Sequence, residues 1–579
     1  MRKVLTTKKS KKRKPKLSPE QKRKRTIERQ FKSNINTVFQ NAGFEQIATR
    51  NKTLYFEDER GEIDSIFIYE NIIVISEDTC TEASEHIADH LRKKAVYYNI
   101  IRKKPGEFVD YLKTQFSGFK KHIEKNKNYA KSDYHIVFLY CSRYPLHNKY
   151  KEQNKNITFL DYPYLRYFLS LSRTIHRTTK YELFKFLKLN KEDIGVDPGK
   201  SHKEIEGFLL PEARSGFDTE HKLVTFYIDP NSLIELCYVL RKDASWLDVD
   251  SLYQRLLRPS KIKNMREFIA TNKRVFINNI IVTLPSDTKL IDEKGKEIST
   301  EYPASSKAQP IKLQIPQKFN AIGIIDGQHR VFAYHEGNDK YEEIISKERL
   351  KQNLLLTGIM FPREQKDETK LKFESKLFME INDKQTRVRP DLKQAIQKIL
   401  SPFESTSIAK AIISELAFNG PLTDKLEVHF YDTSKIKTTS IVAYGLKHLV
   451  KLDGNDTLFK VWNNSQKLNL LKRKDKSLLN QYVAFCVEEI NHFLGAFKFE
   501  LSKNNMFVLD KKKSRALTST SINGLIYCLR KIVENNKARG FENYKKAFEN
   551  LKINFEPQKF RFKSSNWKSL GDEIYKQCF

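Results

Sequence analysis

The stretch NAIGIIDGQHRVFAYHEG (residues 320–337) combines an apolar run, a short polar turn and a segment with helical spacing. NAIGII has the length and apolar character of a buried strand, and the glycine of the DGQ turn permits an abrupt change of backbone direction. HRVFAYHEG then has the spacing of a helix that ends at Gly337. The stretch therefore predicts strand, turn and helix, which is the repeating unit of an α/β domain.

The first turn of a helix that follows a strand is a favourable place for an anion, because its backbone N–H groups point outward and the helix dipole favours negative charge. Gly327 would allow close backbone approach, Arg330 would offer a bidentate fork, and His329 could donate to an oxygen or transfer a proton. Asp326 could bind a divalent ion or orient a hydroxyl. The plain alternative is that Asp326 only caps the helix, with His329 and Arg330 satisfied at the surface.

Strand and helix patterns alternate on both sides of this stretch. KLVTFYI (222–228), RVFINNIIVTLP (274–285) and LLLTGIMF (354–361) predict strands, whereas KIKNMREFIAT (261–271) and KLKFESKLFMEI (370–381) predict helices. A polar insertion runs from Asp287 to about Pro310. Beyond about residue 400 the patterns are mostly helical, apart from the strand-like EVHFYD at 427–432.

IIDGQHR (324–330) resembles the signature of the DGQHR-domain family, whose best-known members are DNA-phosphorothioation regulators of the Dnd type (DndB). PSKIKNMREFIATNKRVFINNIIVTL (259–284) resembles the helix and strand that precede the signature in that family. KLFMEINDKQTRVRP (376–390) resembles its following helix and IN-xx-Q turn. Together these segments cover roughly residues 205–400. The family in turn resembles the ParB and sulfiredoxin superfold, in which a related motif binds a nucleoside triphosphate.

The resemblance implies that Gly327, His329 and Arg330 contact the phosphates of ATP or CTP, bound with Mg²⁺. Gln328 stands where sulfiredoxins have their catalytic cysteine, so the resemblance does not support thiol chemistry. It still supports nucleotide binding or hydrolysis. The predicted catalytic residues are Asp326, His329 and Arg330; the predicted nucleotide-binding residues are Gly327, Gln328, His329, Arg330, Asn382 and Gln385.

The segment INDKQTRVRP supplies the last two of these residues. It brings Asn382, Gln385 and Thr386 together just after a helix, and amides there can read a base or ribose edge. An ordinary turn, in which these side chains pair with the local backbone, is the alternative.

GEIDSIFIYENIIVISEDTC (61–80) has the outline of a PD-(D/E)xK nuclease core, with Asp64 and Glu77 in the carboxylate positions. Two carboxylates on adjacent strands can hold Mg²⁺, which would polarise a phosphate and activate water. Thr79 occupies the lysine position, so cleavage is less favoured unless Arg92, Lys93 or Lys94 reaches in from the next helix. A degenerate DNA-binding domain or an unrelated α/β domain are the alternatives.

Two further patterns bear on metals and thiols. His86 and His90 lie four apart on the helix predicted from Ser84 to Asn99, but they lack a third ligand in a zinc motif. The six cysteines are scattered without CxxC spacing, so we expect buried thiols and no zinc.

The chain has 579 residues and a formal net charge of +34, which favours a polyanionic partner, with nucleic acid ahead of a membrane. Residues 1–32 hold 15 Lys or Arg against two Glu. This tail is either disordered and searching for phosphate or merely solubilising. Lys511, Lys512, Lys513 and Arg515 form a second DNA-binding candidate, whereas KFRFKSSNWK (559–568) alternates like a half-buried strand. Without a run of about 18 apolar residues, we expect a cytoplasmic protein with no membrane contact.

These patterns predict an α/β protein with a mostly helical C-terminal extension. We expect a disordered basic tail over residues 1–25, a PD-(D/E)xK or restriction-endonuclease-like domain over 26–190, a linker over 191–204, a ParB/sulfiredoxin-like DGQHR domain over 205–400 and a mainly helical region over 401–579. The leading hypothesis is a DNA-binding protein of a DNA-modification or anti-phage system, with other proteins of that system as possible partners. Its DGQHR site would be a nucleotide-dependent switch or hydrolase. A non-catalytic DndB-like repressor and a Mg²⁺-dependent nuclease are the alternatives.

Overall fold

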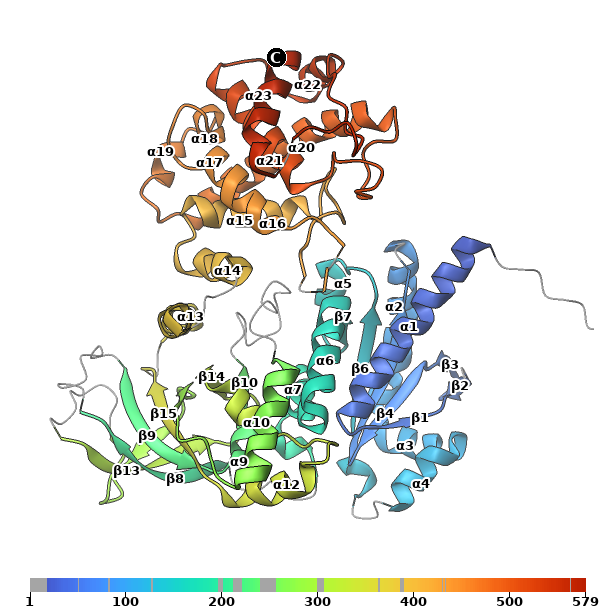
Figure 1. The fold of residues 1–579 in the computed structure, drawn as a ribbon. Coiled ribbons are helices and arrows are strands. Elements are labelled where there is room, and N and C mark those ends of the chain that lie inside the picture. Colours follow the sequence, from blue (N-terminus) through green and yellow to red (C-terminus); the bar gives the residue numbers. More distant parts are fainter. Residues whose placement is uncertain are drawn as a thin grey trace, which may run out of the picture.

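The computed structural model describes residues 18–579, except for 50–51, 82–83, 126–128, 196–200, 212–220, 240–256, 299–306, 363–364, 386–389, 430, 433 and 563. Figure 1 shows a first α/β part (18–195), a second α/β part beside it (201–362) and a helical part above both (365–579). The mixed α/β class and the helical C-terminal region are as predicted. Among the described helices, none combines the length and apolarity needed to cross a bilayer.

The first helix, α1 (Pro19–Asn41), starts earlier than the sequence predicts. Ser18 and Gln21 bond each other reciprocally: Gln21 N donates to Ser18 Oγ and Ser18 N donates to Gln21 Oε1, both at 3.1 Å. This capping box and Pro19 at the first helical position fix the start. The prediction of disorder is therefore wrong for residues 19–25, and residues 1–17 lie outside the described residues.

The first α/β part contains a mixed sheet in the order β1-β4-β5-β6-β7. β4 is antiparallel to β1 and β5, whereas β5, β6 and β7 run parallel. The strands are β1 (Glu45–Ile47), β4 (Ser65–Tyr69), β5 (Ile72–Thr79), β6 (His135–Ser142) and β7 (Thr158–Asp161), with a separate hairpin of β2 (Thr53–Phe56) and β3 (Glu59–Glu62). The helices after α1 are α2 (Ser84–Lys103), α3 (Pro105–Gln115), α4 (Ser117–Lys125), α5 (Asn148–Gln153), α6 (Tyr162–Ile175) and α7 (Thr179–Phe186).

Alternation along the strands assigns the two faces of this sheet. Phe67 and Val74 belong to the buried cluster that includes residues of α1 and α6, whereas Ile73 and Ile75 pack in a cluster with residues of α2 and α3. Consecutive residues at the end of β5 therefore face different helices. Glu77 shares the α2 side with Ile73 and Ile75.

The second α/β part contains a larger mixed sheet in the order β10-β14-β11-β15-β9-β8-β13-β12. Its strands are β8 (His202–Leu209), β9 (Lys222–Ile228), β10 (Cys237–Val239), β11 (Ile280–Thr283), β12 (Lys289–Ile291), β13 (Gln309–Pro316), β14 (Ile322–Asp326) and β15 (Leu354–Met360). Its helices are α9 (Pro230–Leu236), α10 (Pro259–Asn272), α11 (Gln328–Phe332) and α12 (Glu342–Lys351). β8 begins at His202, inside the segment expected as a linker.

A continuous buried apolar cluster runs through both α/β parts, from Phe31 to Met360. Polar contacts join them as well. Lys180 Nζ lies 2.7 Å from Glu336 Oε1, and Glu336 N donates to Thr178 Oγ1 at 2.9 Å. The two parts therefore pack as neighbours across a shared core.

The helical part has its own apolar core. Its main helices are α13 (Asp367–Gln385), α14 (Pro390–Leu400), α15 (Ser405–Leu416), α20 (Lys476–Ser502), α21 (Ser519–Glu534), α22 (Phe541–Phe548) and α23 (Trp567–Cys578). Its shorter helices are α16 (Thr438–Ser440), α17 (Lys447–Leu449), α18 (Leu458–Val461) and α19 (Lys467–Leu470). α13 and α14 connect it to the second sheet (Figure 1).

Two predicted strands in the helical part are wrong. The described residues of EVHFYD form no strand, because Asp432 Oδ2 accepts hydrogen bonds from the backbone of Val428 and His429, at 3.0 and 2.9 Å, and bends the chain into a turn. The described residues 559–562 of KFRFKSSNWK also lack strand pairing. Phe560 and Phe562 instead pack against the helical core.

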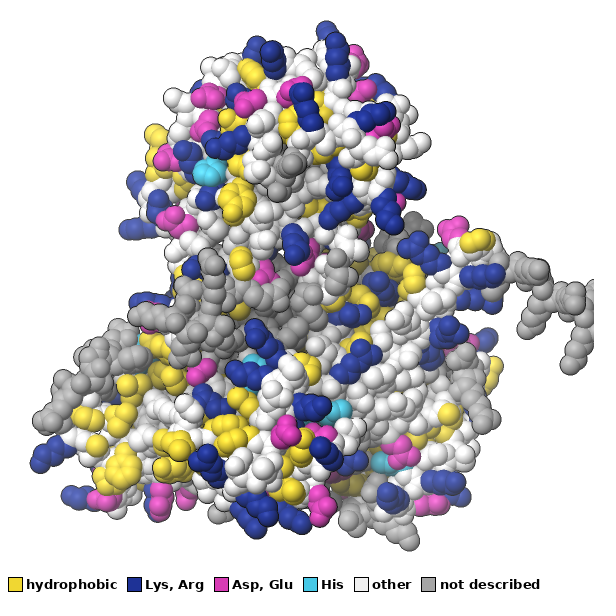
Figure 2. Space-filling view, viewed as in Figure 1, with side chains coloured by type: hydrophobic (Ala, Val, Ile, Leu, Met, Phe, Trp, Pro, Cys, Tyr) yellow, Lys and Arg dark blue, Asp and Glu magenta, His cyan; other side chains and the backbone are white. Residues whose placement is uncertain are grey.

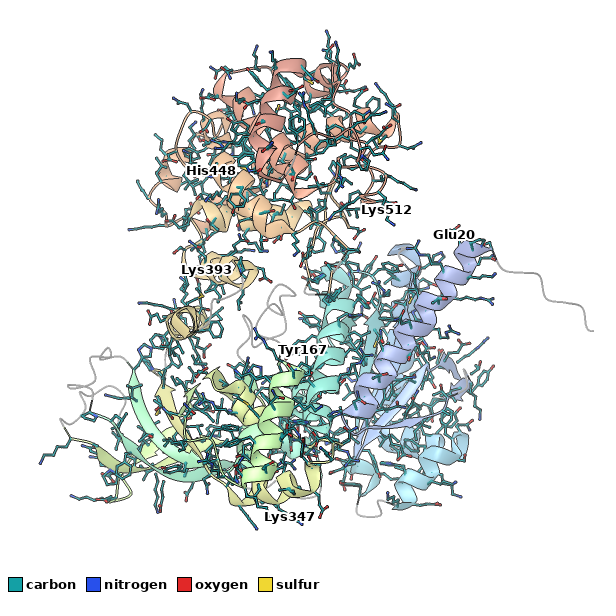
Figure 3. The ribbon with its side chains drawn as sticks, in the orientation of Figure 1. Glu20, Tyr167, Lys347, Lys393, His448 and Lys512 are labelled. Atoms are coloured by element: carbon teal, nitrogen blue, oxygen red, sulfur yellow. The ribbon has the colours of Figure 1, made fainter. Side chains whose placement is uncertain are left out.

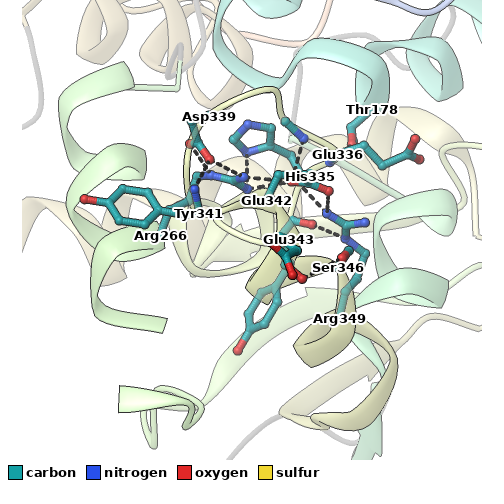
Figure 4. Close-up of polar contacts among 12 residues, drawn as sticks. Thr178, Arg266, His335, Glu336, Asp339, Tyr341, Glu342, Glu343, Ser346 and Arg349 are labelled. Carbon is teal, nitrogen blue, oxygen red and sulfur yellow. Dashed lines mark hydrogen bonds and ion pairs between the residues drawn. The ribbon is translucent and has the colours of Figure 1, made fainter. Parts of the chain in front are cut away.

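The helix of the DGQHR stretch is shorter than predicted, because it ends at Phe332 rather than Gly337. Arg266 of α10 donates to the carbonyl oxygens of Ala333 and His335, at 3.0 and 2.8 Å, and Arg349 of α12 donates to that of His335 at 2.8 Å. These guanidinium groups bond carbonyl groups of the turn that follows the helix (Figure 4). In that turn Tyr334 N donates to the carbonyl oxygen of Val331 and His335 N to that of Phe332, at 3.1 and 3.2 Å, so the α-helical pattern has already ended. The predicted strand over 274–285 is likewise shortened to β11.

Arg266 is held from the opposite side by carboxylates. Its Nε and Nη2 donate to Asp339 at 2.7 and 2.9 Å, and its Nη2 also donates to Glu342 at 2.8 Å. The Arg266 side chain is only 1% exposed. The turn after α11 is therefore built around a buried guanidinium with matched acceptors.

We expect Arg266→Ala to lower the free energy of unfolding by about 3 kcal/mol, since in a partly buried site Asp339 would lose its counter-charge and Glu342 would keep only that of Arg349. Urea denaturation followed by circular dichroism measures the change. Arg274→Ala, at an exposed position after α10, is the control and should stay within about 0.5 kcal/mol of wild type. Equal effects of the two substitutions would contradict this role of Arg266.

Candidate functional site

The DGQHR turn lies at the carboxyl end of β14, where Gly327 has a positive φ of 96°. A Cβ atom at Gly327 would come within 2.9 Å of Arg330 Nη2 and of Ile280 Cγ1. Glycine is therefore required here both for the backbone conformation and for the close packing of Arg330 over the turn.

Arg330 and Asp326 are paired with each other. Arg330 Nη2 lies 3.0 Å from Asp326 Oδ2, and the side chains are 14% and 23% exposed. Burial lowers the pKa of Arg330 from its ordinary value, and Asp326 opposes this change. Asp326 accepts from the Arg330 side chain and, among the described contacts, from no backbone N–H of α11, so the capping part of the plain alternative is wrong, whereas Arg330 is satisfied within the protein as that alternative expects.

Gln328 and His329, which lie between this pair in the sequence, are mostly buried. His329 Nε2 accepts a hydrogen bond of 3.1 Å from the backbone N–H of Arg258. Gln328 is 5% exposed, and its Nε2 makes no hydrogen bond within the described part of the chain. The turn thus contains a hydrogen-bond donor with no partner among the described residues, Gln328 Nε2, next to the ion pair of Asp326 and Arg330.

Asn382 and Gln385 do not lie in a turn, because α13 continues through Gln385. Their side chains and all of Thr386 lie outside the described residues. The predicted turn at Asn382 is therefore wrong for the backbone, and the proposed contact of both amides with a nucleotide stays a prediction.

Asp64 and Glu77 meet at the ends of two antiparallel strands. Ser65 pairs with Ser76, which places Asp64, just before β4, opposite Glu77 on β5. Asp64 adds to the rise in the pKa of Glu77 that burial causes. Asp64 Oδ2 also accepts the backbone N–H of Asp78 at 3.0 Å. The carboxylates that the nuclease outline predicts are thus brought together.

Lys94 of α2 reaches this carboxyl pair from the adjacent helix. Its Nζ lies 2.6 Å from Glu77 Oε1, and the two side chains are 9% and 3% exposed. Lys94 Nζ also donates to the carbonyl oxygen of Glu62. Of the three basic residues that the sequence offered, only Lys94 points inward, because Arg92 and Lys93 pair with Asp89 on an exposed face.

Burial governs protonation at this site. It raises the pKa of Glu77 well above its ordinary value, and Lys94 opposes the rise while Asp64 adds to it. Glu77 Oε1 is buried and makes no hydrogen bond within the described residues, although it contacts Lys94 as an ion pair. A carboxylate oxygen has more than one lone pair, so Glu77 Oε1 could bind a cation in addition to its contact with Lys94.

The donor set fits Mg²⁺, which commonly binds through one or two carboxylates and completes its shell with water and substrate phosphate. Asp64 and Glu77 would be those carboxylates. Over the described residues there is no group of three or more His, Cys, Asp or Glu arranged for a metal ion. His90 Nδ1 lies 3.1 Å from the hydroxyl of Tyr140, and burial lowers the pKa of His90.

Lys32 is a residue that the sequence analysis missed. Its Nζ lies 3.7 Å from Asp64 Oδ1 and 3.8 Å from Asp78 Oδ2, on the α1 side of the sheet. Its only sequence signal is its position beside the buried Phe31, at the border of the apolar face of α1. The acidic strand ends are thus flanked by one lysine from each covering helix.

The basic residues before α21 are accessible. Lys511, Lys512 and Lys513 are exposed in a turn, and Arg515 is partly buried, with its backbone N–H bonded to the carbonyl of Phe555 at 2.8 Å. Figure 3 shows Lys512 at the lower edge of the helical part, on the side toward α1.

Comparison of the chain with family models, curated proteins and solved structures found no match.

The pH dependence of stability should report on Asp78. Burial raises its pKa to about 6, with Asp64 adding to the rise and Lys32 opposing it. The folded state therefore holds this proton where the unfolded chain has lost it, and the free energy of unfolding should fall as pH rises from about 4 to about 6. At about 1.4 kcal/mol per pKa unit, the loss is roughly 1–3 kcal/mol after allowance for partial exposure.

Urea denaturation of wild type and Asp78→Asn across this pH range measures the effect. The slope contributed by Asp78 should be absent from the variant. Parallel curves for the two proteins would show that Asp78 has an ordinary pKa.

Proposed function

We propose that the protein acts on DNA in the cytoplasm and cleaves phosphodiester bonds with Mg²⁺ at Asp64, Glu77 and Lys94. The observation that carries the proposal is the 2.6 Å contact of Lys94 Nζ with Glu77, beside Asp64 at the same end of the sheet. The element order α1, β1, β4, β5, α2, β6 supports a restriction-endonuclease-like domain, with the lysine supplied by α2 instead of position 79.

When bound, Mg²⁺ would polarise the scissile phosphate and lower the pKa of a water molecule. Asp64 and Glu77 would hold the ion. Lys94, anchored by the carbonyl of Glu62, would orient the attacking water and offset charge that develops on the phosphate. Because Lys94 is almost fully buried, its charge would act with little screening by solvent.

The charge distribution supports a DNA partner. Figure 2 shows lysine and arginine side chains spread over the helical part and along α1. Lys511–Lys513 add exposed positive charge on the side toward α1. A protein that uses many such contacts on the phosphate backbone binds with strong salt dependence. We place this activity in a DNA-modification or anti-phage defence system, together with other proteins of that system.

Nicking of plasmid DNA with Mg²⁺ or Mn²⁺ tests the cleavage. Asp64→Asn and Lys94→Ala should each lower the rate on the order of 100-fold or more, since each removes a group that acts on the reacting phosphate. Lys93→Ala is the matched control, because Lys93 pairs with Asp89 at the surface. Circular dichroism checks that all variants are folded. Nicking that survives Asp64→Asn would refute the site, and specific binding without nicking would support a repressor.

A second candidate function is a nucleotide-dependent switch at the DGQHR turn, in a ParB/sulfiredoxin-like domain. The observation that favours it is the buried Gln328 amide with an unused donor, next to the positive-φ Gly327. A phosphate oxygen could accept from Gln328 and compete with Asp326 for Arg330. Asp326 would then be free to bind Mg²⁺.

Turnover of ATP and CTP, measured with and without DNA, tests the switch. Arg330→Ala should lower turnover at least about 10-fold, since a bidentate phosphate contact is lost. Arg274→Ala is the control for the loss of one positive charge. An Arg330→Ala protein that hydrolyses nucleotide as fast as wild type would remove the turn from consideration.

A further inference from the structure

A cluster of Arg143, Tyr162, Arg166 and Tyr431 lies at the end of β6 and the start of α6, on the side of the first sheet that α1 covers; we call it the arginine–tyrosine cluster. Arg143 directly follows β6, and its backbone N–H donates to the carbonyl oxygen of Thr79 at 2.9 Å. Tyr162 and Arg166 lie in the first turns of α6. Tyr431 comes from the helical part, in the turn between Leu426 and Ile436 that descends toward α5 and α6 (Figure 1).

The rings and guanidinium groups of the cluster lie in direct contact. Arg143 Cζ is 3.7 Å from the centroid of the Tyr162 ring, and Arg166 Cζ is 5.1 Å from that of Tyr431. The two tyrosine rings meet edge to face, with centroids 5.5 Å apart. Each arginine is thus oriented by an aromatic face, and the rings link the first α/β part to the helical part.

Among the described residues, neither arginine of the cluster is paired with a carboxylate, and Arg166 Nε is buried without a hydrogen bond. Asp161, one residue from Tyr162, is paired instead with Lys151. Burial raises the pKa of Tyr431, so its ring stays neutral and cannot supply the missing negative charge. Arg143 and Arg166 are each held against a tyrosine ring and keep N–H donors without partners among the described residues. They are therefore suited to bind an anion from outside the protein.

The location of the cluster indicates which anion it binds. Thr79 lies two residues beyond Glu77, at about 3.3 Å of rise per residue, and β6 lies about 4.8 Å from β5. The carboxyl ends of β5 and β6 lie at the same edge of the sheet. A DNA strand with one phosphate at Asp64 and Glu77 would therefore carry neighbouring phosphates along the edge where Arg143 lies.

We propose that Arg143 and Arg166 bind backbone phosphates of the DNA strand next to the bond that is cut, and that Tyr162 and Tyr431 hold them in position. This inference rests on the proposed function, whose substrate it locates. The helical part then completes the DNA site through Tyr431. Arg143 and Arg166 are positioning residues, since they lie away from the reacting phosphate.

Binding of fluorescent duplex DNA by the full chain carrying Asp64→Asn tests the proposal without cleavage. Dissociation constants are measured over a series of salt concentrations in Ca²⁺ and, in parallel, in EDTA. Arg143→Ala and Arg166→Ala should each weaken binding about 10-fold and reduce the salt slope by about one, as loss of one phosphate contact requires. Tyr431→Ala should weaken binding less and leave the slope intact, whereas Tyr431→Phe should bind as the parent does.

Arg473→Ala is the matched control. Arg473 is an exposed arginine of the helical part, paired with Glu404 at 2.8 Å, and its removal changes the net charge equally. Affinity and slope should be unchanged. Thermal denaturation of each variant separates DNA binding from a purely structural link between the two parts.

The outcomes distinguish the two proposals. Unchanged affinity in folded Arg143→Ala and Arg166→Ala proteins overturns the inference, and a lowered melting temperature with normal DNA binding assigns the cluster to structure alone. If wild type binds DNA through these arginines but never nicks it, the nuclease proposal fails and the phosphate contacts stand. If wild type nicks DNA and both variants do so with unchanged KM, the inference about the arginine–tyrosine cluster fails, whereas the nuclease proposal stands.

Discussion

The ion pair of Glu77 and Lys94 constrains the whole first α/β part. Both groups are almost completely removed from water, where a charge without a partner is costly, so each lowers the cost of burying the other. α2 must therefore cross the sheet with Lys94 above the end of β5. The antiparallel register of β4 and β5 then places Asp64 beside Glu77. The position of the candidate catalytic groups follows from this single contact, and α3 and α4 close the sheet face behind it.

Local sequence patterns predicted the strands and the helix that carry Asp64, Glu77 and Lys94. The alternation of GEIDSIFIYENIIVISED predicted β4 and β5, and the absence of lysine at Thr79 pointed to the next helix. Which of Arg92, Lys93 and Lys94 reaches inward could not be predicted, because neighbouring helical residues differ in direction by about 100° and small shifts decide burial. Lys32 was missed because only the fold brings α1 next to the strand ends.

The errors have a common physical origin in contacts between residues distant in sequence. HRVFAYHEG has helical spacing throughout, but the helix ends at Phe332, and Arg266, from a helix more than sixty residues earlier, bonds carbonyl groups of the turn that follows. The sequence correctly predicted that the DGQHR turn contains a glycine that changes the backbone direction and that it follows a strand. The ion pair of Asp326 and Arg330 was not predicted, because both side chains were expected to contact a bound ligand instead of each other. Glu336 and Lys180 join the end of this stretch to the first sheet through Tyr69.

The contact of Tyr431 with α6 has a consequence for biosynthesis. The two residues that it brings together, Tyr162 and Tyr431, are separated by nearly half of the chain. Ribosomes add about 5–20 residues per second, so the first sheet emerges on the order of tens of seconds before the turn that covers α6. A nascent chain would therefore have its carboxyl pair assembled early, whereas the complete surface around it would exist only once translation has passed the helical part.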